Sequence, residues 1–412
     1  MTHSPSRLAA ASRSTYVAFI ASGFAFASWA SRIPQVRNGL RLSSAELGLV
    51  LLAIAAGSIV SLPLAGTIVS RLSSRRTVAG MSVVLATGLA VAAIGFLVGV
   101  VPLLIGLFLL GFANGAWDVA MNVQGGTVER HLGRAIMPRF HAGFSAGTVA
   151  GALGGALMVA LNVPVTAHLL VVAVMIAGFV PFAVRDFLGD EVEVSPAPQA
   201  RADTGSESAL SRWREPRTLL IGVVVLAFAF SEGGGNDWIN VALIDGYHAP
   251  AVVGTLGFAA FLAAMTAVRW FGTGLLDRFG RVPVLRGLAA VAVTGIVLFV
   301  FSPFTPLAFV GAVLWGAGAS LGFPVGMSAA GDEPAAAAGR VSVVASIGYC
   351  AFLGGPPLIG FLGNHVTVLR ALLVVAALLA LATLVTSALR LLPGSAQDET
   401  ALIAPAGGES QS

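Results

Sequence analysis

The sequence predicts an all-α membrane protein of twelve transmembrane helices, arranged as two pseudo-symmetric six-helix bundles. Three observations predict this fold: an apolar composition, twelve apolar segments of spanning length, and matching features in the two halves. Hydrophobic residues make up 57% of the 412 residues and charged residues 10%, whereas soluble domains carry about 25% charged residues. So few charges cannot cover a water-facing surface of this size. The 50 glycines suit the close packing of membrane helices.

A helix needs about 20 apolar residues to cross about 30 Å of hydrocarbon. The first apolar run follows Arg13 and could also be a signal peptide, but its removal would spoil the twofold pattern described below. We therefore expect spans at residues 14–32, 44–70, 77–98, 102–128, 138–161, 164–185, 217–244, 251–276, 282–302, 304–329, 339–362 and 366–390.

The basic residues predict the orientation. All 23 of them are arginines, and most fall in loops on one side of the predicted spans. The other side carries only Arg32, Arg37, Arg41 and Arg370. Because cytoplasmic loops are enriched in basic residues, we expect both termini in the cytoplasm and a location in a bacterial inner membrane. The arginines form no single basic stripe, so we expect no nucleic-acid partner.

The chain divides into four predicted parts: an N-terminal bundle (1–187), a disordered cytoplasmic linker (188–214), a C-terminal bundle (215–391) and a disordered tail (392–412). The linker is polar and rich in Pro and Ser, so it cannot bury enough apolar surface to fold alone. Features recur at a spacing of about 205–209 residues: Ser70-Arg71 matches Asp277-Arg278, and Trp29 matches Trp238. Parallel six-helix repeats suit a transporter that rocks around a central site.

The loop after the second span reads Gly66-x-x-x-Ser70-Arg71 with Arg75-Arg76 following, and the loop after the eighth reads Asp277-Arg278-Phe279-Gly280-Arg281. Both resemble the loop signature of the major facilitator superfamily, with Ser70 where the family has Asp. Segments 27–34, 118–122, 139–141, 232–238 and 355–360 are similar to the MosC/YbjJ-like bacterial branch. The resemblance implies a twelve-helix transporter whose spans 1, 4, 7 and 10 line a central cavity.

The resemblance also implies a cytoplasmic latch that holds the halves together when the outside is open. Its residues are Arg71, Arg75, Arg76, Asp277, Arg278 and Arg281. Simple anchoring of the arginines by the positive-inside rule is the alternative. Segment 151–155 in span 5 lacks the proline of the superfamily's antiporter signature, which disfavours drug–proton antiport and leaves it as the alternative function.

Two predicted spans carry a polar stripe. Asn114, Asp118 and Asn122 lie four residues apart in span 4, so they share one narrow helical face. Span 7 carries a similar polar stripe, formed by Glu232, Asn236 and Asn240. An ionisable group in hydrocarbon costs several kcal/mol, about 3 on insertion scales, so both stripes are expected to face a wet interior. Packing contacts between helices are the alternative.

Gly233-Gly234-Gly235 directly follow Glu232, and a triple glycine is expected to weaken the helix and free its backbone for binding or bending. Asp237 and Trp238 lie further toward the outside. Trp29 and Trp238 could stack on a ring-shaped solute, although aromatic residues near an interface are more often anchors.

We predict Glu232, Asp118 and His141 as candidates for proton coupling. The candidates for substrate binding are Asn114, Asn122, Asn236, Asn240, Asp237, Trp29, Trp238 and Arg269. Burial favours the protonated form of a carboxyl group, which suits a proton carrier. Arg269 could pair with a buried acid or bind an anion, but a structural or snorkelling arginine is the favoured interpretation. His141 could relay protons or cap the interface.

The predicted function is secondary active transport of a small polar organic solute, sugar- or cyclitol-like, by alternating access with proton coupling. The alternatives are a proton-antiport exporter of metabolites or drugs and a membrane sensor that moves no solute. An enzyme is not expected, because no nucleophile–base pair has a spacing that implies contact. The single cysteine, Cys350, excludes an intrachain disulfide and a Cys-based metal site. We expect a monomer in the lipid bilayer without cofactor or metal.

Overall fold

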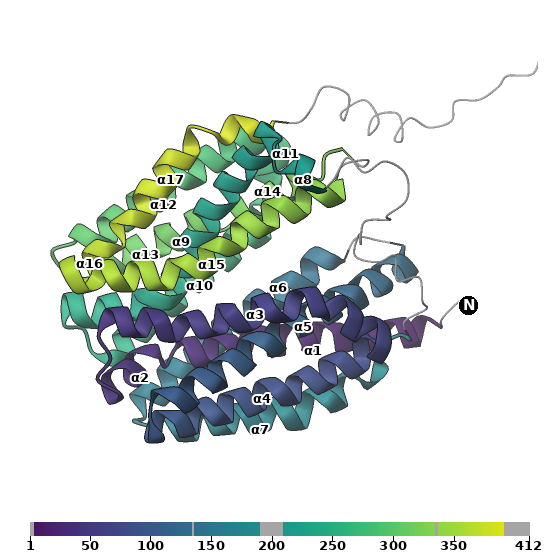
Figure 1. The fold of residues 1–412 in the computed structure, drawn as a ribbon, viewed down its shortest axis with the longest axis horizontal. Coiled ribbons are helices and arrows are strands. Elements are labelled where there is room, and N and C mark those ends of the chain that lie inside the picture. Colours follow the sequence, from purple (N-terminus) through teal and green to yellow (C-terminus); the bar gives the residue numbers. More distant parts are fainter. Residues whose placement is uncertain (1–3, 134–135, 190–208, 334–336, 391–412) are drawn as a thin grey trace, which may run out of the picture.

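The computed structural model describes residues 4–133, 136–189, 209–333 and 337–390, and this part of the chain contains helices and no strand (Figure 1). Most of the predicted linker and the predicted tail lie outside the described residues. The elements are α1 (Pro5–Ala30), α2 (Ile33–Gly39), α3 (Ser44–Leu72), α4 (Ser74–Val98), α5 (Val100–Leu132), α6 (Met137–Ala160), α7 (Val165–Ala183), η1 (Val184–Asp186), α8 (Ala209–Arg212), α9 (Pro216–Tyr247), α10 (Ala251–Phe271), α11 (Thr273–Phe279), α12 (Arg281–Phe301), α13 (Thr305–Ala319), α14 (Gly322–Ala330), α15 (Ala337–Val366), α16 (Val368–Ala371), α17 (Leu373–Thr383) and η2 (Thr386–Leu389).

Within the described ranges, ten helical segments are long and apolar enough to cross a membrane. Their bounds fall within several residues of the corresponding predicted spans. The first and last predicted spans are not among the ten. In their places are α1, which has 26 residues, and the shorter apolar helix Val368–Thr383. The described residues therefore form an all-helical structure with ten candidate membrane spans.

Glycines let neighbouring helices approach at matching positions in the two halves. A Cβ added to Gly88 of α4 would lie 2.7 Å from the carbonyl of Gly106 in α5. A Cβ added to Gly295 of α12 would lie the same 2.7 Å from the carbonyl of Gly311 in α13. The glycines of the second pair follow those of the first by about 205–207 residues, which is within the spacing at which sequence features recur in the two halves. Small residues at these crossings allow van der Waals packing that larger side chains would prevent.

The triple glycine does not break α9, which runs continuously from Pro216 to Tyr247. The helix is therefore not interrupted where bending was expected, and packing explains two of the three glycines, Gly234 and Gly235. A Cβ on Gly235 would lie 2.3 Å from the Phe261 ring, and one on Gly234 would meet Ile359 and Val375 at 3.3 Å. The glycines make room for neighbouring helices, and the hydrogen bonds of the helix remain intact.

The predicted tenth span is instead divided at Ser320 and Leu321 into α13 and α14. Pro324 explains the division, because it has no N–H to donate to the carbonyl of Ser320 four residues earlier. Gly322 adds a second reason: its Cα faces the Phe228 ring so closely that a Cβ would lie 1.9 Å from it. The span predicted at 304–329 matches the candidate span Thr305–Ala330, and the break lies within it.

Helices α1–α7 gather on one side of the molecule and α9–α17 on the other (Figure 1). We call these groups the N half and the C half. The end of the molecule that carries α2 and α16 is the α2 end, and the opposite end, with α8 and α11, is the α11 end. The halves meet where α3 packs on α15, α6 on α10 and α2 on α9.

The α2 end holds the tightest contacts between the halves. A Cβ added to Gly48 of α3 would lie 2.5 Å from the carbonyl of Pro356 in α15, and one added to Gly360 would lie 2.4 Å from the carbonyl of Ser44. Arg37 of α2 forms an ion pair with Asp245 of α9. The halves are thus closed against each other at this end.

Candidate functional site

The stripe on α9 faces the N half. Asn240 donates a hydrogen bond of 3.0 Å to the carbonyl of Ala30 in α1, so the face that carries the stripe points across the interface. Asn236 lies one turn below Asn240, and its buried side-chain oxygen has no hydrogen-bond partner among the described residues. Glu232 lies one further turn below and is about one-fifth exposed.

Glu232 is paired with Arg269. The guanidinium of Arg269 on α10 lies 2.7 Å from the Glu232 carboxylate. Its Nε donates a second hydrogen bond of 3.0 Å to the carbonyl of Ser320, where α13 ends. This is the carbonyl that Pro324 leaves without a helical donor. Arg269 therefore joins α9, α10 and the break between α13 and α14.

The stripe on α5 is held differently. Ser22 of α1 donates a hydrogen bond of 3.0 Å to the side-chain oxygen of Asn114. Asn122 donates to the backbone carbonyl of Asp118 at 2.8 Å and to its carboxylate at 3.2 Å. Asp118 is half-buried and has no cation partner within the described part of the chain. The three predicted residues therefore do lie on one face, and their carboxylate is not neutralised.

Two further polar residues lie on helices that form the interface between the halves. His141 lies on α6, which packs on α10, and Tyr349 lies on α15, which packs on α3. Tyr349 shares a helical face with Pro356 and Gly360, seven and eleven residues later, and that face packs on α3.

The remaining substrate-binding candidates differ in exposure. Asp237 is half-buried and has no hydrogen bond or ion pair with any described residue. Trp29 and Trp238 are 1% and 0% exposed. Their indole N–H groups have no partner in the described ranges. Both rings lie inside the helix packing of this conformation, so stacking on a solute stays a prediction.

The six predicted latch residues form no ion pair across the halves in the described structure. Arg71, Arg75 and Arg76 are exposed, as are Asp277 and Arg278. Arg281 bonds to Asp332 at 2.7 Å within the C half. Among the described residues, these six side chains thus add no ion pair between the halves at the α11 end.

Sequence reasoning missed an ionic network at the α11 end of the C half. Asp332 is 4% exposed and accepts from Arg217 at 2.9 Å as well as from Arg281. Nearby, Glu215 accepts from Arg340 at 2.6 Å and pairs with Arg212. Part of the signal was available: Asp332 and Glu333 stand together in a short loop between two apolar segments, ahead of Arg340.

Glu215 lies just outside the first helix of the C half. Burial would raise the pKa of its carboxyl, but hydrogen bonds from Arg212, Arg340 and Thr218 outweigh this effect and lower the pKa to about 2. The network therefore needs the carboxylate to be ionised.

A second missed feature lies near the α2 end of the N half. Arg32 was assigned to an outer loop, yet its side chain is buried. It donates to Nδ1 of His168 at 2.9 Å and to the carbonyl of Val163 at 3.1 Å. His168 lies in the first turn of α7, inside a predicted span. Because it is 136 residues from Arg32 in the sequence, their pairing could not be predicted from residue spacing. The pair ties α1 to α7 and is structural in form.

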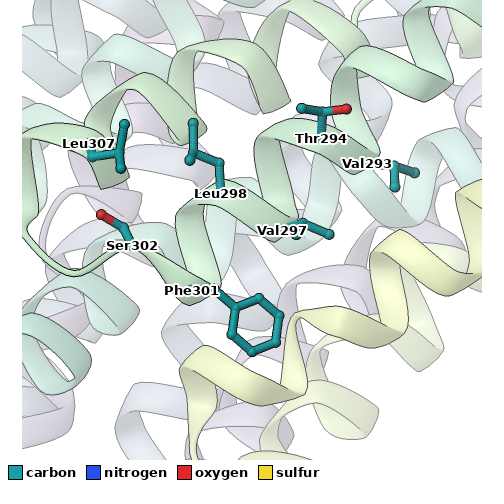
Figure 2. Close-up of a pocket in the computed structure, with 7 residues that line it drawn as sticks. All are labelled: Val293, Thr294, Val297, Leu298, Phe301, Ser302 and Leu307. Carbon is teal, nitrogen blue, oxygen red and sulfur yellow. The ribbon is translucent and has the colours of Figure 1, made fainter.

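One surface hollow lies away from these groups. Figure 2 shows it between α12 and the start of α13. Its lining includes Val297 and Phe301, which are exposed apolar side chains of the kind that face hydrocarbon in a membrane protein, and it includes none of the predicted site residues. The candidate site is therefore the interface between the halves rather than this hollow.

Known proteins match the chain over most of its length. The model of the Major Facilitator Superfamily matches residues 15–354. The uncharacterized transporter y4wD of Sinorhizobium fredii is 32% identical over 359 residues, which cover 86% of this chain and 92% of that protein. An uncharacterized MFS-type transporter of Yersinia pestis is 31% identical, over 85% and 88%. The membrane protein MosC of Rhizobium meliloti is 28% identical, over 87% and 85%.

Solved structures share the fold. The nucleoside transporter NupG superposes with a TM-score of 0.71 at 14% identity, covering 91% of this chain and 98% of that one. A bacterial homolog of the human lysosomal transporter Spinster, in an inward-facing and occupied conformation, also has a TM-score of 0.71, at 12% identity over 92% and 96%. The family match and the curated relatives, rather than these structures, show that the chain is a transporter and not an enzyme, and that it belongs to the Major Facilitator Superfamily.

Proposed function

We propose that this protein is a secondary active transporter that moves a small polar organic solute across a bacterial inner membrane by alternating access, coupled to protons. One observation carries the proposal: membrane-embedded polar groups lie on the face of α9 that points toward the N half. On this face Asn240 bonds to the carbonyl of Ala30 in α1, and Glu232 pairs with Arg269 of α10, the helix that packs on α6. Polar side chains in a membrane interior usually mark a substrate or ion pathway.

The architecture we propose has twelve spans in two six-helix bundles. It adds α1 and the segment Val368–Thr383 to the ten candidate spans. The bundles are residues 1–187 and 215–391, joined by a cytoplasmic linker at 188–214 and followed by a tail at 392–412. The matching glycine contacts of α4 with α5 and of α12 with α13 support this twofold repeat. The arginine distribution supports cytoplasmic termini, and we propose a monomer.

The conformation supports alternating access. Contacts between the halves are tight at the α2 end, which the arginines place outside. Among the described residues, the predicted latch residues at the α11 end form no ion pair between the halves. We infer from this a state open to the cytoplasm, and the latch would form in the opposite state. Small contacts of this kind can bias such a two-state equilibrium.

For proton coupling we propose the Glu232–Arg269 pair. Protonation of Glu232 would remove the charge that holds Arg269, which would leave the guanidinium attached to α13 through Ser320 alone. Protonation of Glu232 could thus change the position of the break between α13 and α14. Asp118, which has no cation partner, is the second proton carrier in this proposal.

The solute is proposed to be sugar- or cyclitol-like. Asn114, Asn122 and Asn236 supply the amide groups that bind hydroxyl-rich molecules, and Asn236 has an unsatisfied oxygen ready to accept. The structural neighbour NupG is named a nucleoside transporter, so nucleosides belong among the solutes to be tested.

The test uses proteoliposomes that contain the pH-sensitive dye pyranine. Addition of myo-inositol, glucose or uridine on one side should acidify the lumen if solute and protons enter together. Alkalinisation would instead support the proton-antiport exporter. A solute that binds the purified protein while neither solute nor protons cross would support the sensor. Empty liposomes and the Glu232→Gln variant are the controls, and solute flux without any proton flux in the native protein would contradict the coupling.

A further inference from the structure

The guanidinium of Arg269 is held in place by a contact that does not involve Glu232. Its Nε donates a hydrogen bond of 3.0 Å to the carbonyl of Ser320, a residue that is 0% exposed. Its Nη2 donates to the Glu232 carboxylate at 2.7 Å, and its Nη1 has no hydrogen bond to any described residue. The bond to Ser320 therefore fixes the positive charge here whether or not Glu232 is ionised.

The pair lies at the depth of the membrane interior, and the protein does not seal it. Glu232 is at the middle of α9, and Ser320 lies within the candidate span Thr305–Ala330. The side chains of Arg269 and Glu232 are 28% and 21% exposed. Both partners therefore keep surface that a solute can contact.

Protonation of Glu232 would leave this cation without a counter-ion. Asp237 of α9, Tyr349 of α15 and His141 of α6 are ionisable groups on the same helix or on helices that pack on α9 or α10. None of them has a hydrogen bond or ion pair with Arg269 in the described structure. An uncompensated charge in a membrane interior is costly, so another anion should take the place of the neutralised carboxylate.

The free donors indicate which anion fits. With Nε bound to Ser320, the Nη1 and Nη2 groups remain side by side on one edge of the planar guanidinium. A carboxylate accepts two parallel hydrogen bonds from such an edge. A neutral polyol would accept hydrogen bonds here but would leave the charge of Arg269 unbalanced. One carboxylate together with one proton on Glu232 keeps the net charge of the site unchanged.

We propose that the transported solute carries a carboxylate group, which replaces Glu232 on the Arg269 guanidinium when Glu232 is protonated. This inference rests on the proposed transport function and narrows its substrate class from polar solutes in general to hydroxylated carboxylates. Asn236 lies one turn from Glu232 on the same stripe, and its unpartnered side-chain oxygen would accept a hydroxyl group of the same solute.

The experiment compares matched probes on the purified full-length protein in detergent at pH 7.5, in a buffer without organic acids. D-Gluconate is compared with D-sorbitol, and D-glucuronate with D-glucose, by thermal shift and by isothermal titration. Glu232→Gln represents the protonated state. It should bind the carboxylate member of a pair about tenfold more tightly than the native protein does, because an ionised Glu232 no longer competes for Arg269.

Asp186→Asn is the matched control for the loss of one negative charge. Asp186 is exposed in η1 of the N half and has no ion pair with a described residue, so this variant should bind the probes as the native protein does. Arg269→Gln should abolish the preference for carboxylates, and Arg269→Lys should retain part of it. The gain of affinity in Glu232→Gln needs no change at Arg269, so it tests the proposal even where an Arg269 variant does not fold.

The proposal is overturned if Glu232→Gln binds the carboxylate and neutral members equally, if it gains no affinity for either carboxylate, or if Asp186→Asn gains as much. Proton-coupled flux of sorbitol or glucose without carboxylate binding would leave the transport function standing and remove this inference. Arg269-dependent binding of gluconate by a protein that moves neither solute nor protons would keep the binding site and remove the transport function.

Discussion

Arg269 on α10 donates hydrogen bonds both to the Glu232 carboxylate on α9 and to the carbonyl of Ser320, which is 0% exposed. The second bond compensates for Pro324, because proline cannot supply the helical donor that Ser320 needs. One guanidinium thus satisfies a membrane-embedded acid and a broken helix together. The planar fork of arginine can do this, whereas the point charge of lysine is poorly suited to two divergent acceptors.

Arg269→Ala should therefore destabilise the protein. It leaves the carboxylate and the carbonyl without their donor, and we expect a loss of about 1–3 kcal/mol, because both side chains of the pair are partly exposed. Arg269→Lys should recover only part of the loss. The measurement is thermal unfolding in detergent, with the folded fraction at each temperature determined by size-exclusion chromatography. Equal stability of all three proteins would contradict the structural role of Arg269.

Glu232→Gln should uncouple proton movement from solute movement while the folded protein stays in the membrane. The glutamine oxygen can still accept a hydrogen bond from Arg269, but the side chain no longer titrates. Proton flux in pyranine-loaded proteoliposomes, measured beside solute counterflow, tests this expectation. Counterflow should persist because it needs no proton gradient. Full retention of coupled proton flux in the variant would remove Glu232 from the mechanism.

Gly235→Ala should destabilise α9 against α10. Its new Cβ would lie 2.3 Å from the buried Phe261 ring, and such overpacking costs about 1–3 kcal/mol. Gly233→Ala is the matched control in the same triple glycine, because its Cβ would meet Phe352 at an ordinary 3.4 Å. The control should be neutral or slightly stabilising, since alanine favours a helix by about 1 kcal/mol over glycine. Similar destabilisation by both substitutions would restore the view that these glycines serve flexibility.

The comparison of α9 with α13 and α14 indicates what sequence patterns predict well. The positions of the spans follow from the lengths of the apolar runs. This signal is strong because unsatisfied backbone groups in lipid are costly, so a segment that crosses the membrane must be helical throughout. The polar stripes follow from helical spacing alone, and Asn122 does bond to Asp118 as a shared face requires. The breaking of a helix is harder to predict, because three glycines keep α9 intact while one proline divides the tenth span.

Contacts between residues that are distant in the sequence could not be predicted either. Glu232 and Arg269 were both singled out, but nothing in their spacing of 37 residues determines that they pair. Arg32 and His168 are 136 residues apart, and their contact depends on how α1 packs against α7. Positive charge near a predicted loop indicated an exposed arginine, and tertiary packing buried it instead.

The network around Glu215 should depend on pH. The pKa of this carboxyl is lowered to about 2 in the folded protein, below its ordinary value of about 4.3. Its stabilising effect should be fully present above pH 4.3 and should be lost as the pH falls toward 2. Thermal stability of the native protein and of Glu215→Gln should therefore differ at pH 6 and converge at the acidic limit. A difference that stays constant with pH would show that the ionised carboxylate contributes nothing.

The last prediction concerns the ion pair between Arg37 and Asp245, which joins α2 to α9 at the closed end. Because a partly exposed pair contributes only about 0–1 kcal/mol, Arg37→Ala should shift the population toward a state open at the α2 end by a factor of up to about five. Ser44→Cys can report this change. Ser44 is buried under α15 at the crossing, and Cys350→Ser removes the native thiol beforehand.

In that background, a membrane-impermeant maleimide should label Cys introduced at position 44 faster when Arg37 is replaced. Arg370→Ala is the matched control, because Arg370 is exposed near the same end and its side chain has no ion pair with a described residue. If both arginine substitutions accelerate labelling equally, general loss of positive charge explains the effect. If neither does, the closure of the α2 end depends on the glycine crossing of α3 with α15 and not on this ion pair.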